Sequence, residues 1–233
     1  MTYVLSLGGS IIAPPEGPDV NFLVEFRRKL DHWLKEDGSR KVILVTGGGG
    51  PARTFQAAFK EFLSRSGSPA ARDEVLDRIG IAATRINAQL VAAALGELCL
   101  DPVVEDPSGP IAFSGRVLVA AGWKPGFSSD FDAVYLGERF GASTVLNLSN
   151  IAKVYTADPR LDPEAKPLDA ISWKDFRGLV GSVWVPGANL PFDPIASERA
   201  EKAGMKVVCA AGKDLDNLFR ILDGKPFVGT VIG

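Results

Sequence analysis

Hydrophobic positions along the first quarter of the chain follow two different periods. Short apolar runs at residues 3–7 and 41–45 are typical of buried strands. Between them, apolar residues recur at helical spacing over residues 20–36, which predicts a helix with one apolar face. Phe55, Phe59 and Phe62 repeat at the same spacing after the second run and predict another helix. The pattern is therefore strand, helix, strand, helix.

The same alternation continues to the end of the chain. It predicts helices at residues 74–98, 130–140, 194–203 and 214–222, and strands at residues 101–105, 116–121, 143–148, 205–209 and 227–232. Short buried strands that alternate with helices favour an α/β fold, with a mostly parallel sheet covered by helices on both faces. We expect residues 1–233 to form a single domain, in which a change of composition near residues 148–166 separates two halves.

Charge and composition exclude several classes of function. Lys plus Arg number 26 and Asp plus Glu number 28, so no positive excess points to nucleic acid or an anionic membrane as a partner. The single histidine, His32, argues against Ser–His or Cys–His catalysis and against a zinc site. Cys99 and Cys209 lie in or beside apolar runs and are interpreted as core residues. With no export signal and no run of about 18 apolar residues, we expect a cytoplasmic protein.

Glycine clusters follow the first two predicted strands. Gly8 and Gly9 with Ser10 follow the first strand, and residues 47–50 are four glycines after the second. Glycine lets the backbone approach a ligand closely, and the free N–H groups at a helix start favour a phosphate. Arg53 lies one turn further on and is able to donate two hydrogen bonds to a phosphate. The alternative is that these glycines only make tight turns between strand and helix.

Two known phosphate motifs do not account for the clusters. The G-x-x-x-x-G-K-[ST] pattern of a P-loop is absent. The residues from Gly47 to Ala52 satisfy a loose dinucleotide fingerprint, but the acidic residue expected about 20 residues later, at the end of a strand, is missing. A nicotinamide-dependent oxidoreductase is therefore the weaker alternative to a phosphate-transferring enzyme.

Five sequence blocks resemble those of a known family. They read VLSLGGS at 4–10, VTGGGGPAR at 45–53, DRIGIAATRINAQLVAAAL at 77–95, AGWKPGFSSD at 121–130 and VYTADP at 154–159. In this order they are similar to the amino-acid kinase fold family and, within it, to archaeal-type uridylate (UMP) kinases. The resemblance implies a three-layer αβα sandwich and transfer of the γ-phosphoryl group of ATP to UMP. It also implies Mg²⁺ carried mainly by the nucleotide phosphates, nucleotides as the small-molecule partners, and a hexamer built from dimers.

The resemblance further implies roles for individual residues. In the acceptor half, about residues 1–148, UMP would be bound by Gly48, Asp77, Trp123, Lys124, Pro125, Gly126, Phe127, Ser128 and Ser129. In the ATP half, about residues 149–233, ATP would be held by Ser149, Asn150, Tyr155 and Asp158, with Gly9, Ser10, Gly49 and Arg53 from the first half. The catalytic set would be Gly8, Gly9, Ser10, Arg53 and Asp193, with Asp193 organising magnesium or water.

Several of these residues have simpler interpretations when each is taken alone. Asp77 is equally a charge near a helix N-terminus, and Tyr155 a half-buried aromatic of a strand or loop. Asp158 before a proline is a turn signal, and Ser128 before a helix is an N-cap. The resemblance, rather than these residues alone, assigns them to nucleotides.

Departures from the family pattern leave two other functions open. Ser6 stands where many members have lysine, Trp123 replaces threonine, and Ala152 with Lys153 replace an Asp-Gly pair. One hypothesis is that Lys124 or Lys153 supplies the charge missing at Ser6. The alternatives to a uridylate kinase are a kinase for another small acceptor and a noncatalytic relative that binds a nucleotide or oxyanion for storage or sensing.

Overall fold

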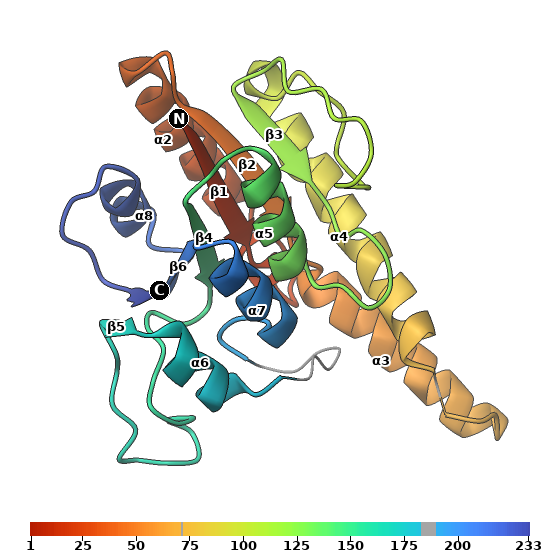
Figure 1. The fold of residues 1–233 in the computed structure, drawn as a ribbon. Helices are drawn as coiled ribbons and strands as arrows, with labels where there is room; N and C mark the ends of the chain where they lie inside the picture. The colour runs from red at the N-terminus through yellow and green to blue at the C-terminus, as the bar shows by residue number, and fades with distance from the viewer. Residues whose placement is uncertain (71, 183–189) are drawn as a thin grey trace.

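A mostly parallel sheet forms the centre of the molecule. The computed structural model describes residues 1–70, 72–182 and 190–233 (Figure 1). The 7-stranded sheet has the order β3-β2-β1-β4-β6-β7-β5, and only the β6–β7 pair is antiparallel. The strands are β1 Thr2–Leu7, β2 Lys41–Thr46, β3 Val117–Ala120, β4 Thr144–Ser149, β5 Ala170–Ile171, β6 Lys206–Ala211 and β7 Thr230–Ile232.

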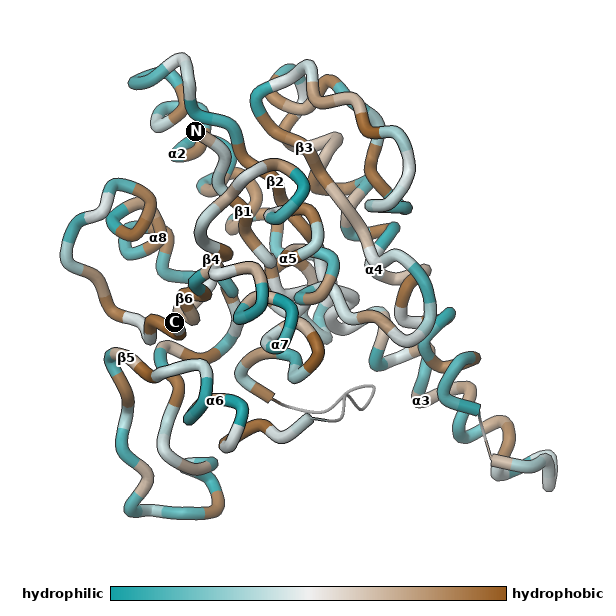
Figure 2. Tube along the Cα trace, in the orientation of Figure 1, coloured by the Kyte–Doolittle hydropathy of each residue, from teal (hydrophilic) through white to brown (hydrophobic). Residues whose placement is uncertain are grey.

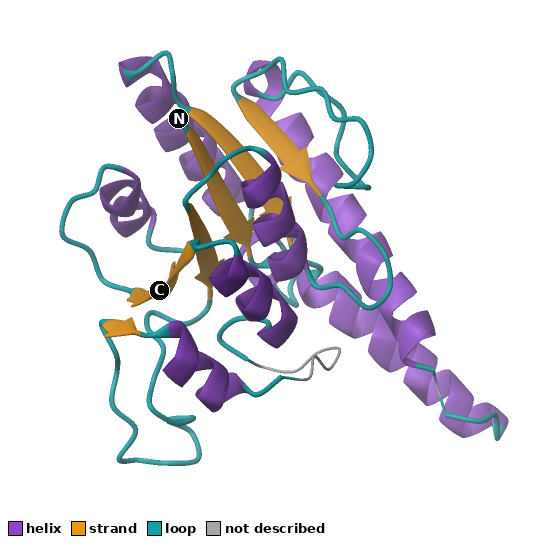
Figure 3. Ribbon diagram, in the orientation of Figure 1, coloured by secondary structure: helices purple, strands orange, loops and turns teal. Residues whose placement is uncertain are grey.

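Helices cover both faces of this sheet (Figure 3). Consecutive strand residues alternate between two separate cores: Leu5 and Leu44 belong to one, Val4 and Ile43 to the other. Figure 2 shows hydrophobic colour along β3, whose four residues are all buried. The α/β sandwich is therefore confirmed. The helices are α1 Gly9–Ile12, α2 Val20–Glu36, α3 Gly49–Ser66, α4 Asp73–Leu95, α5 Ser129–Arg139, α6 Trp173–Val180, α7 Pro194–Lys202 and α8 Leu215–Leu222, with a 3-10 turn η1 Gly96–Leu98.

Each core draws on different helices. Helices α2, α4 and α8 contribute Phe26, Val91 and Leu218 to the first. Helices α5 and α6 contribute Val134 and Phe176 to the second, and α7 adds its two buried alanines. The apolar face predicted for residues 20–36 is thus the buried face of α2.

One predicted strand is wrong, and three short elements were not predicted. In residues 101–105 only Val104 pairs, in an isolated bridge with Ala120. The Asp101 carboxylate instead accepts hydrogen bonds from the backbone N–H groups of Ser114 and Gly115, which holds this segment as a loop. The unpredicted elements are α1, β5 and α6.

Helix α3 leaves its apolar side uncovered. Its buried residue is Gly50, whereas Phe55 is 63% exposed and Phe62 60% exposed. The helix packs against α4, and in Figure 1 both extend away from the sheet at the lower right. The helical spacing of the phenylalanines was predicted correctly, but they do not join either core.

Helix α4 is long and apolar. By length and composition, the span Asp73–Leu98 is the one helix among the described residues that is able to cross a membrane. Its residues Ala88, Val91 and Leu95 are buried in the core on one face of the sheet. These residues pack α4 against the sheet as a core helix.

We expect Asp101→Ala to destabilise the fold. The Ser114 and Gly115 donors hold the pKa of Asp101 below its ordinary value, and they lose their acceptor in the variant. The free energy of unfolding should fall by about 2–4 kcal/mol, measured by urea denaturation. Asp106→Ala in the same loop is the control, because the described hydrogen bonds of the Asp106 carboxylate go to Ser108 in an exposed turn. Equal losses in the two variants would contradict this account of the loop.

Candidate functional site

The loops after five neighbouring strands meet at one edge of the sheet. Strands β3, β2, β1, β4 and β6 are consecutive in the sheet and mutually parallel, so their carboxyl ends lie together. Ligands of such sheets bind at this edge. The residues that follow the five strands are Ala121, Gly47, Gly8, Asn150 and Gly212, in that order across the sheet.

The two glycine clusters pack directly against each other. A Cβ atom on Gly9 would lie 2.1 Å from the Gly49 nitrogen, and one on Gly47 would lie 2.6 Å from the Gly9 nitrogen. Gly49 also has a φ of +61°, in the left-handed region. These glycines are therefore required by the contact between the loops, whatever ligand they hold. The close approach of the two loops, rather than a tight turn within either one, accounts for the missing side chains.

Backbone N–H groups remain free along this contact. The amides of Gly8, Gly47 and Gly50 donate to Leu148, Leu7 and Ala13. Among the hydrogen bonds of the described residues, none uses the N–H groups of Gly9, Ser10, Gly48 or Gly49 as donors. Gly49 opens the 18-residue helix α3, whose dipole adds partial positive charge at this point. Amides without a partner at a helix N-terminus are the features that favour an anion such as phosphate.

Polar contacts tie β4 to the same place. Asn150 donates from Nδ2 to the Ser10 hydroxyl at 2.9 Å. The Gly212 amide donates to the Ser149 carbonyl at 2.8 Å. Arg53 is exposed one turn into α3. The structure thus brings Ser10, Ser149 and Asn150 together, with Arg53 on the neighbouring helix.

Acidic side chains lie beneath the edge. Ser6 donates to Asp130 at 2.8 Å, and the Asp193 amide donates to the other oxygen of Asp130 at 3.3 Å. Burial raises the pKa of Asp130 to about 6, opposed by the Ser6 hydrogen bond. Burial also raises the pKa of Asp193, which caps α7 by accepting from the Ala196 amide. Ser6, which stands where many family members have lysine, therefore places a neutral hydroxyl against the Asp130 carboxyl.

The loop between β3 and α5 is held by α4. Asp77 accepts from the Gly126 amide at 2.9 Å, and burial raises the pKa of this carboxyl. The Trp123 and Phe127 rings lie 5.1 Å apart, and the Lys124 ammonium lies 3.8 Å from the Trp123 ring centroid. Asp77 thus holds the backbone of the loop that carries the two rings.

The same loop ends in a helix cap. Ser128 caps α5 by accepting from the Phe131 amide, which confirms the N-cap interpretation. Pro125 lies within the loop, and Ser129 is the first residue of the helix. Gly48, across from the loop, packs against Gly80 of α4, because a Cβ there would lie 3.2 Å from the Gly80 carbonyl oxygen. The acceptor residues that the resemblance named are therefore close to one another around α4.

The remaining predicted residues lie on the segment between β4 and β5. Tyr155 is half-buried and forms an isolated bridge with Pro167. Asp158 is paired with Arg160, which lowers the pKa of Asp158 to about 2. Lys153 is paired with Asp169. The Lys153 ion pair stays within the segment, and the Lys124 ammonium lies over the Trp123 ring. The hypothesis that one of them supplies the charge missing at Ser6 stays a prediction.

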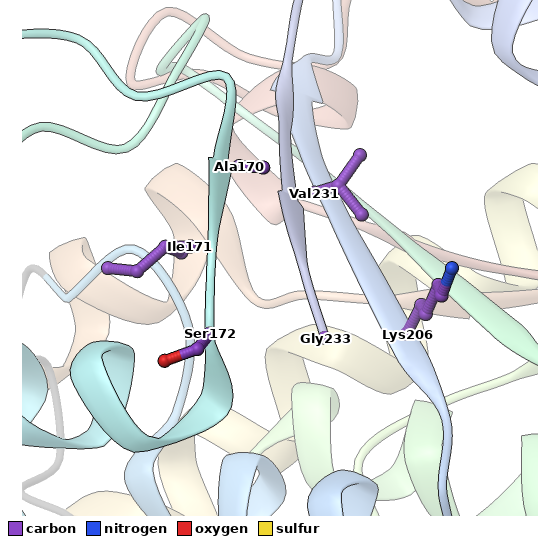
Figure 4. A pocket seen from close by; sticks show the side chains of 6 residues that line it. All are labelled: Ala170, Ile171, Ser172, Lys206, Val231 and Gly233. Atoms are coloured by element: carbon purple, nitrogen blue, oxygen red, sulfur yellow. The ribbon is translucent and has the colours of Figure 1, made fainter.

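A separate pocket lies near β7 and β5, the last two strands in the order of the sheet. Figure 4 shows it between β5, β7 and the start of β6, with a volume of about 270 Å³. It is lined by Ala170, Ile171, Ser172, Lys206, Val231 and Gly233. Since it contains none of the residues at the carboxyl edge, it is not part of the site.

Comparison with known proteins assigns the chain to a family. The sequence profile of the amino acid kinase family matches residues 1–211. The chain belongs to the amino acid kinase family. A uridylate kinase of Methanospirillum hungatei is 32% identical over 99% of this chain and 94% of its own length. One of Pyrococcus abyssi is 32% identical over 97% of this chain and 96% of its own.

Solved structures agree with this membership. The crystal structure of uridylate kinase from Archaeoglobus fulgidus has a TM-score of 0.78 and 29% identity, with 100% of each chain covered. A UMP kinase from Bacillus anthracis has the same TM-score at 18% identity, which shows the common fold alone. The amino acid kinase fold predicted from the five blocks is therefore present.

Two residues of this amino acid kinase were not found by sequence reasoning. Asp132 is fully buried, and one of its oxygens accepts from the Trp123 amide at 3.1 Å. Arg85 donates to the Trp123 carbonyl at 3.3 Å. A signal existed for Asp132, because it stands between Phe131 and Ala133 on the apolar face of a helix. Nothing in the spacing along the chain connects Arg85 to the loop.

We expect Asp132→Asn to change the dependence of stability on pH. Burial raises the pKa of the folded carboxyl to about 7 from 3.8. The unfolded chain therefore loses this proton first, and the folded state loses stability as pH rises between these two values. The unfolding free energy of the variant minus that of the wild type should increase from about pH 4 to pH 8, by about 1.4 kcal/mol per unit of pKa shift.

Urea denaturation at several pH values measures this difference. Asp216→Asn is the control, because the Asp216 side chain is 85% exposed. A difference for Asp132→Asn that is the same at pH 4 and pH 8 would show that the buried carboxyl does not carry the raised pKa.

Proposed function

We propose that this amino acid kinase is a uridylate kinase that transfers the γ-phosphoryl group of ATP to UMP, giving UDP and ADP. Relatives at about 30% identity over nearly their full length carry that name. The observation that carries the proposal is the contact between the glycine loops after β1 and β2. It presents free amide donors beside a second loop that Asp77 holds. The product would serve pyrimidine nucleotide synthesis.

Phosphoryl transfer mainly needs positioning and neutralisation of charge. Gly8, Gly9 and Ser10 would hold the group in transfer through backbone N–H groups and the Ser10 hydroxyl. Gly49 and Arg53 would bind the ATP phosphates at the N-terminus of α3. The attacking atom is a phosphate oxygen of UMP, which carries negative charge at neutral pH and needs no general base. Asp193, which is close to Asp130, would organise water or metal at the edge.

Each nucleotide would be held by one half of the chain. UMP would lie in the half formed by residues 1–148, with its ribose hydroxyls on Asp77, its phosphate at Gly48 and its base near Trp123 and Phe127. Lys124, Pro125, Gly126, Ser128 and Ser129 complete the proposed UMP site. ATP would lie against residues 149–233, through Ser149, Asn150, Tyr155 and Asp158.

Magnesium would be carried mainly by the nucleotide phosphates. Within the described ranges, no group of three or more Asp, Glu, His or Cys side chains is arranged to hold a metal ion. When bound with ATP, Mg²⁺ neutralises phosphate charge. The chain's own contribution would be the amide donors and Arg53, with Asp193 near the water shell of the ion.

We expect ADP release to require UMP. The assay offers UMP, CMP, dUMP, AMP and no acceptor, with ATP and Mg²⁺, and detects ADP and UDP.

Arg53→Ala should lower kcat/KM for UMP by about 100-fold or more, because a charge-assisted contact to phosphate is lost. Arg65→Ala, on the last turn of the same helix, should not change it. Preference for another acceptor would indicate a different kinase, and ATP binding without turnover on any acceptor would indicate a noncatalytic relative.

We further propose that the protein is a cytoplasmic homo-oligomer, a hexamer as the family resemblance implies. The uncovered side of α3 supports self-association, because Phe55, Phe59 and Phe62 lie along one side of the helix and two of them are mostly exposed. A second copy of the same helix offers a matching apolar surface.

We expect Phe55→Glu combined with Phe62→Glu to yield smaller assemblies. Charged residues in an apolar contact lose their hydration without gaining partners, which opposes association. Sedimentation velocity measures the assembly state, with Lys60→Glu on the same helix as the control for added negative charge. If the double variant and the wild type sediment as the same species, α3 is not the contact.

A further inference from the structure

The backbone of Trp123 is held on both sides of its Cα atom, at the N–H group and at the carbonyl. Its N–H donates to Asp132 Oδ2 at 3.1 Å, and its carbonyl accepts from Arg85 Nη2 at 3.3 Å. The two side chains come from different elements, α5 and α4. This double contact fixes the start of the loop that carries the Trp123 indole.

The same two side chains carry a second unusual feature. In the described part of the chain, the buried side-chain polar atoms without a hydrogen-bond partner are Arg85 Nε and Asp132 Oδ1. Such atoms are costly to bury and are rare in folded proteins. Both atoms belong to the two side chains that hold the Trp123 backbone, so this contact concentrates the unpaired buried atoms of the described residues.

Helix α4 holds the rest of the loop as well. The Gly122 amide donates to the Thr84 hydroxyl at 2.8 Å, and the Gly126 amide donates to Asp77 at 2.9 Å. A Cβ on Gly122 would lie 2.9 Å from that hydroxyl, so the backbone sits directly on the helix. Asp77, Thr84 and Arg85 thus bind three successive parts of the loop from one helix.

We propose that Arg85 and Asp132 are positioning residues for the acceptor nucleotide: by holding the Trp123 backbone on both sides of its Cα atom, they set where the indole lies and so set the affinity for UMP. This inference rests on the proposed function, since it concerns the acceptor site. Neither side chain is assigned to contact a reacting atom. Their effect passes through Trp123.

Other charged groups surround these two side chains. Asp130 on the same helix and Asp193 before α7 both raise the pKa of Asp132 after the larger effect of burial, and the Trp123 hydrogen bond lowers it. Arg199 of α7 lies over the Phe131 and Tyr135 rings beside Asp132. On the other side, Arg85 forms an ion pair with Glu105 at 2.9 Å. Lys124 lies over the Trp123 ring.

The matched variants are Arg85→Lys and Arg78→Lys, both on α4. Lysine keeps the charge that pairs with Glu105 but lacks the planar fork that reaches the Trp123 carbonyl. Arg78 pairs with Glu74 on the exposed side of the helix, so its variant is the control. We expect Arg85→Lys to raise the KM for UMP about tenfold, while kcat and the KM for ATP stay within about twofold. Arg78→Lys should change none of these.

Asp132→Asn supplies a second readout. Ionisation of the wild-type carboxyl above about pH 7 leaves a buried charged oxygen without a partner, which favours displacement of the loop. The KM for UMP of the wild type should therefore rise from pH 6 to pH 9 relative to that of the variant. The phosphate of UMP titrates equally in both enzymes, so it cancels in the ratio.

Hydrogen exchange of residues 121–131 separates the possible failures. Faster exchange in Arg85→Lys, with the wild-type melting temperature retained, is expected from a released loop. If the wild type turns over no acceptor, the proposed function fails. The positioning role of Arg85 and Asp132 is then still tested by hydrogen exchange and by calorimetric binding of UMP. An unchanged UMP affinity in Arg85→Lys, or equal losses in kcat and both KM values, would overturn the positioning role.

Discussion

The contact between the two glycine loops is the constraint on which the site depends. Gly9 and Gly49 approach so closely that a single methyl group on either would overlap the backbone of the other loop. This contact is possible because β1 and β2 are adjacent and in parallel register, from Thr2 opposite Lys41 to Leu7 opposite Thr46. No side chains lie where the two glycine loops meet, so backbone N–H groups are the hydrogen-bond donors available there. The proposed anion site is therefore made of main chain.

A second constraint comes from α4, which serves two purposes. Its Ala88, Val91 and Leu95 fill the core on one face of the sheet, while Asp77 and Arg85 hold the β3–α5 loop. The position of the β3–α5 loop is thus tied to a helix that the core fixes. The arrangement also buries two carboxyls of α5, Asp130 and Asp132. Burial raises their pKa values, because it destabilises the charged form of each.

Much of the fold was predictable because it depends on local periodicity. The runs at β1, β2 and β4 and the amphipathic pattern of α2 correspond closely to the observed elements. The segment at Asp101 was not predictable in this way, because a side chain that bonds to Ser114, 13 residues away, decides its conformation. Likewise, the glycine loops and Asp77 were visible as motifs. Arg85 and Asp132 were not, because they contact the backbone of the β3–α5 loop, whose conformation cannot be read from local periodicity.

The most direct test of the phosphate site is a crystal structure with UMP and a nonhydrolysable ATP analogue. The account predicts phosphate oxygens within about 3.2 Å of the amide nitrogens of Gly9, Ser10, Gly48 and Gly49. It further predicts the UMP ribose at Asp77 and its base beside Trp123. Phosphates bound away from the two glycine loops, with those amides facing solvent, would contradict it.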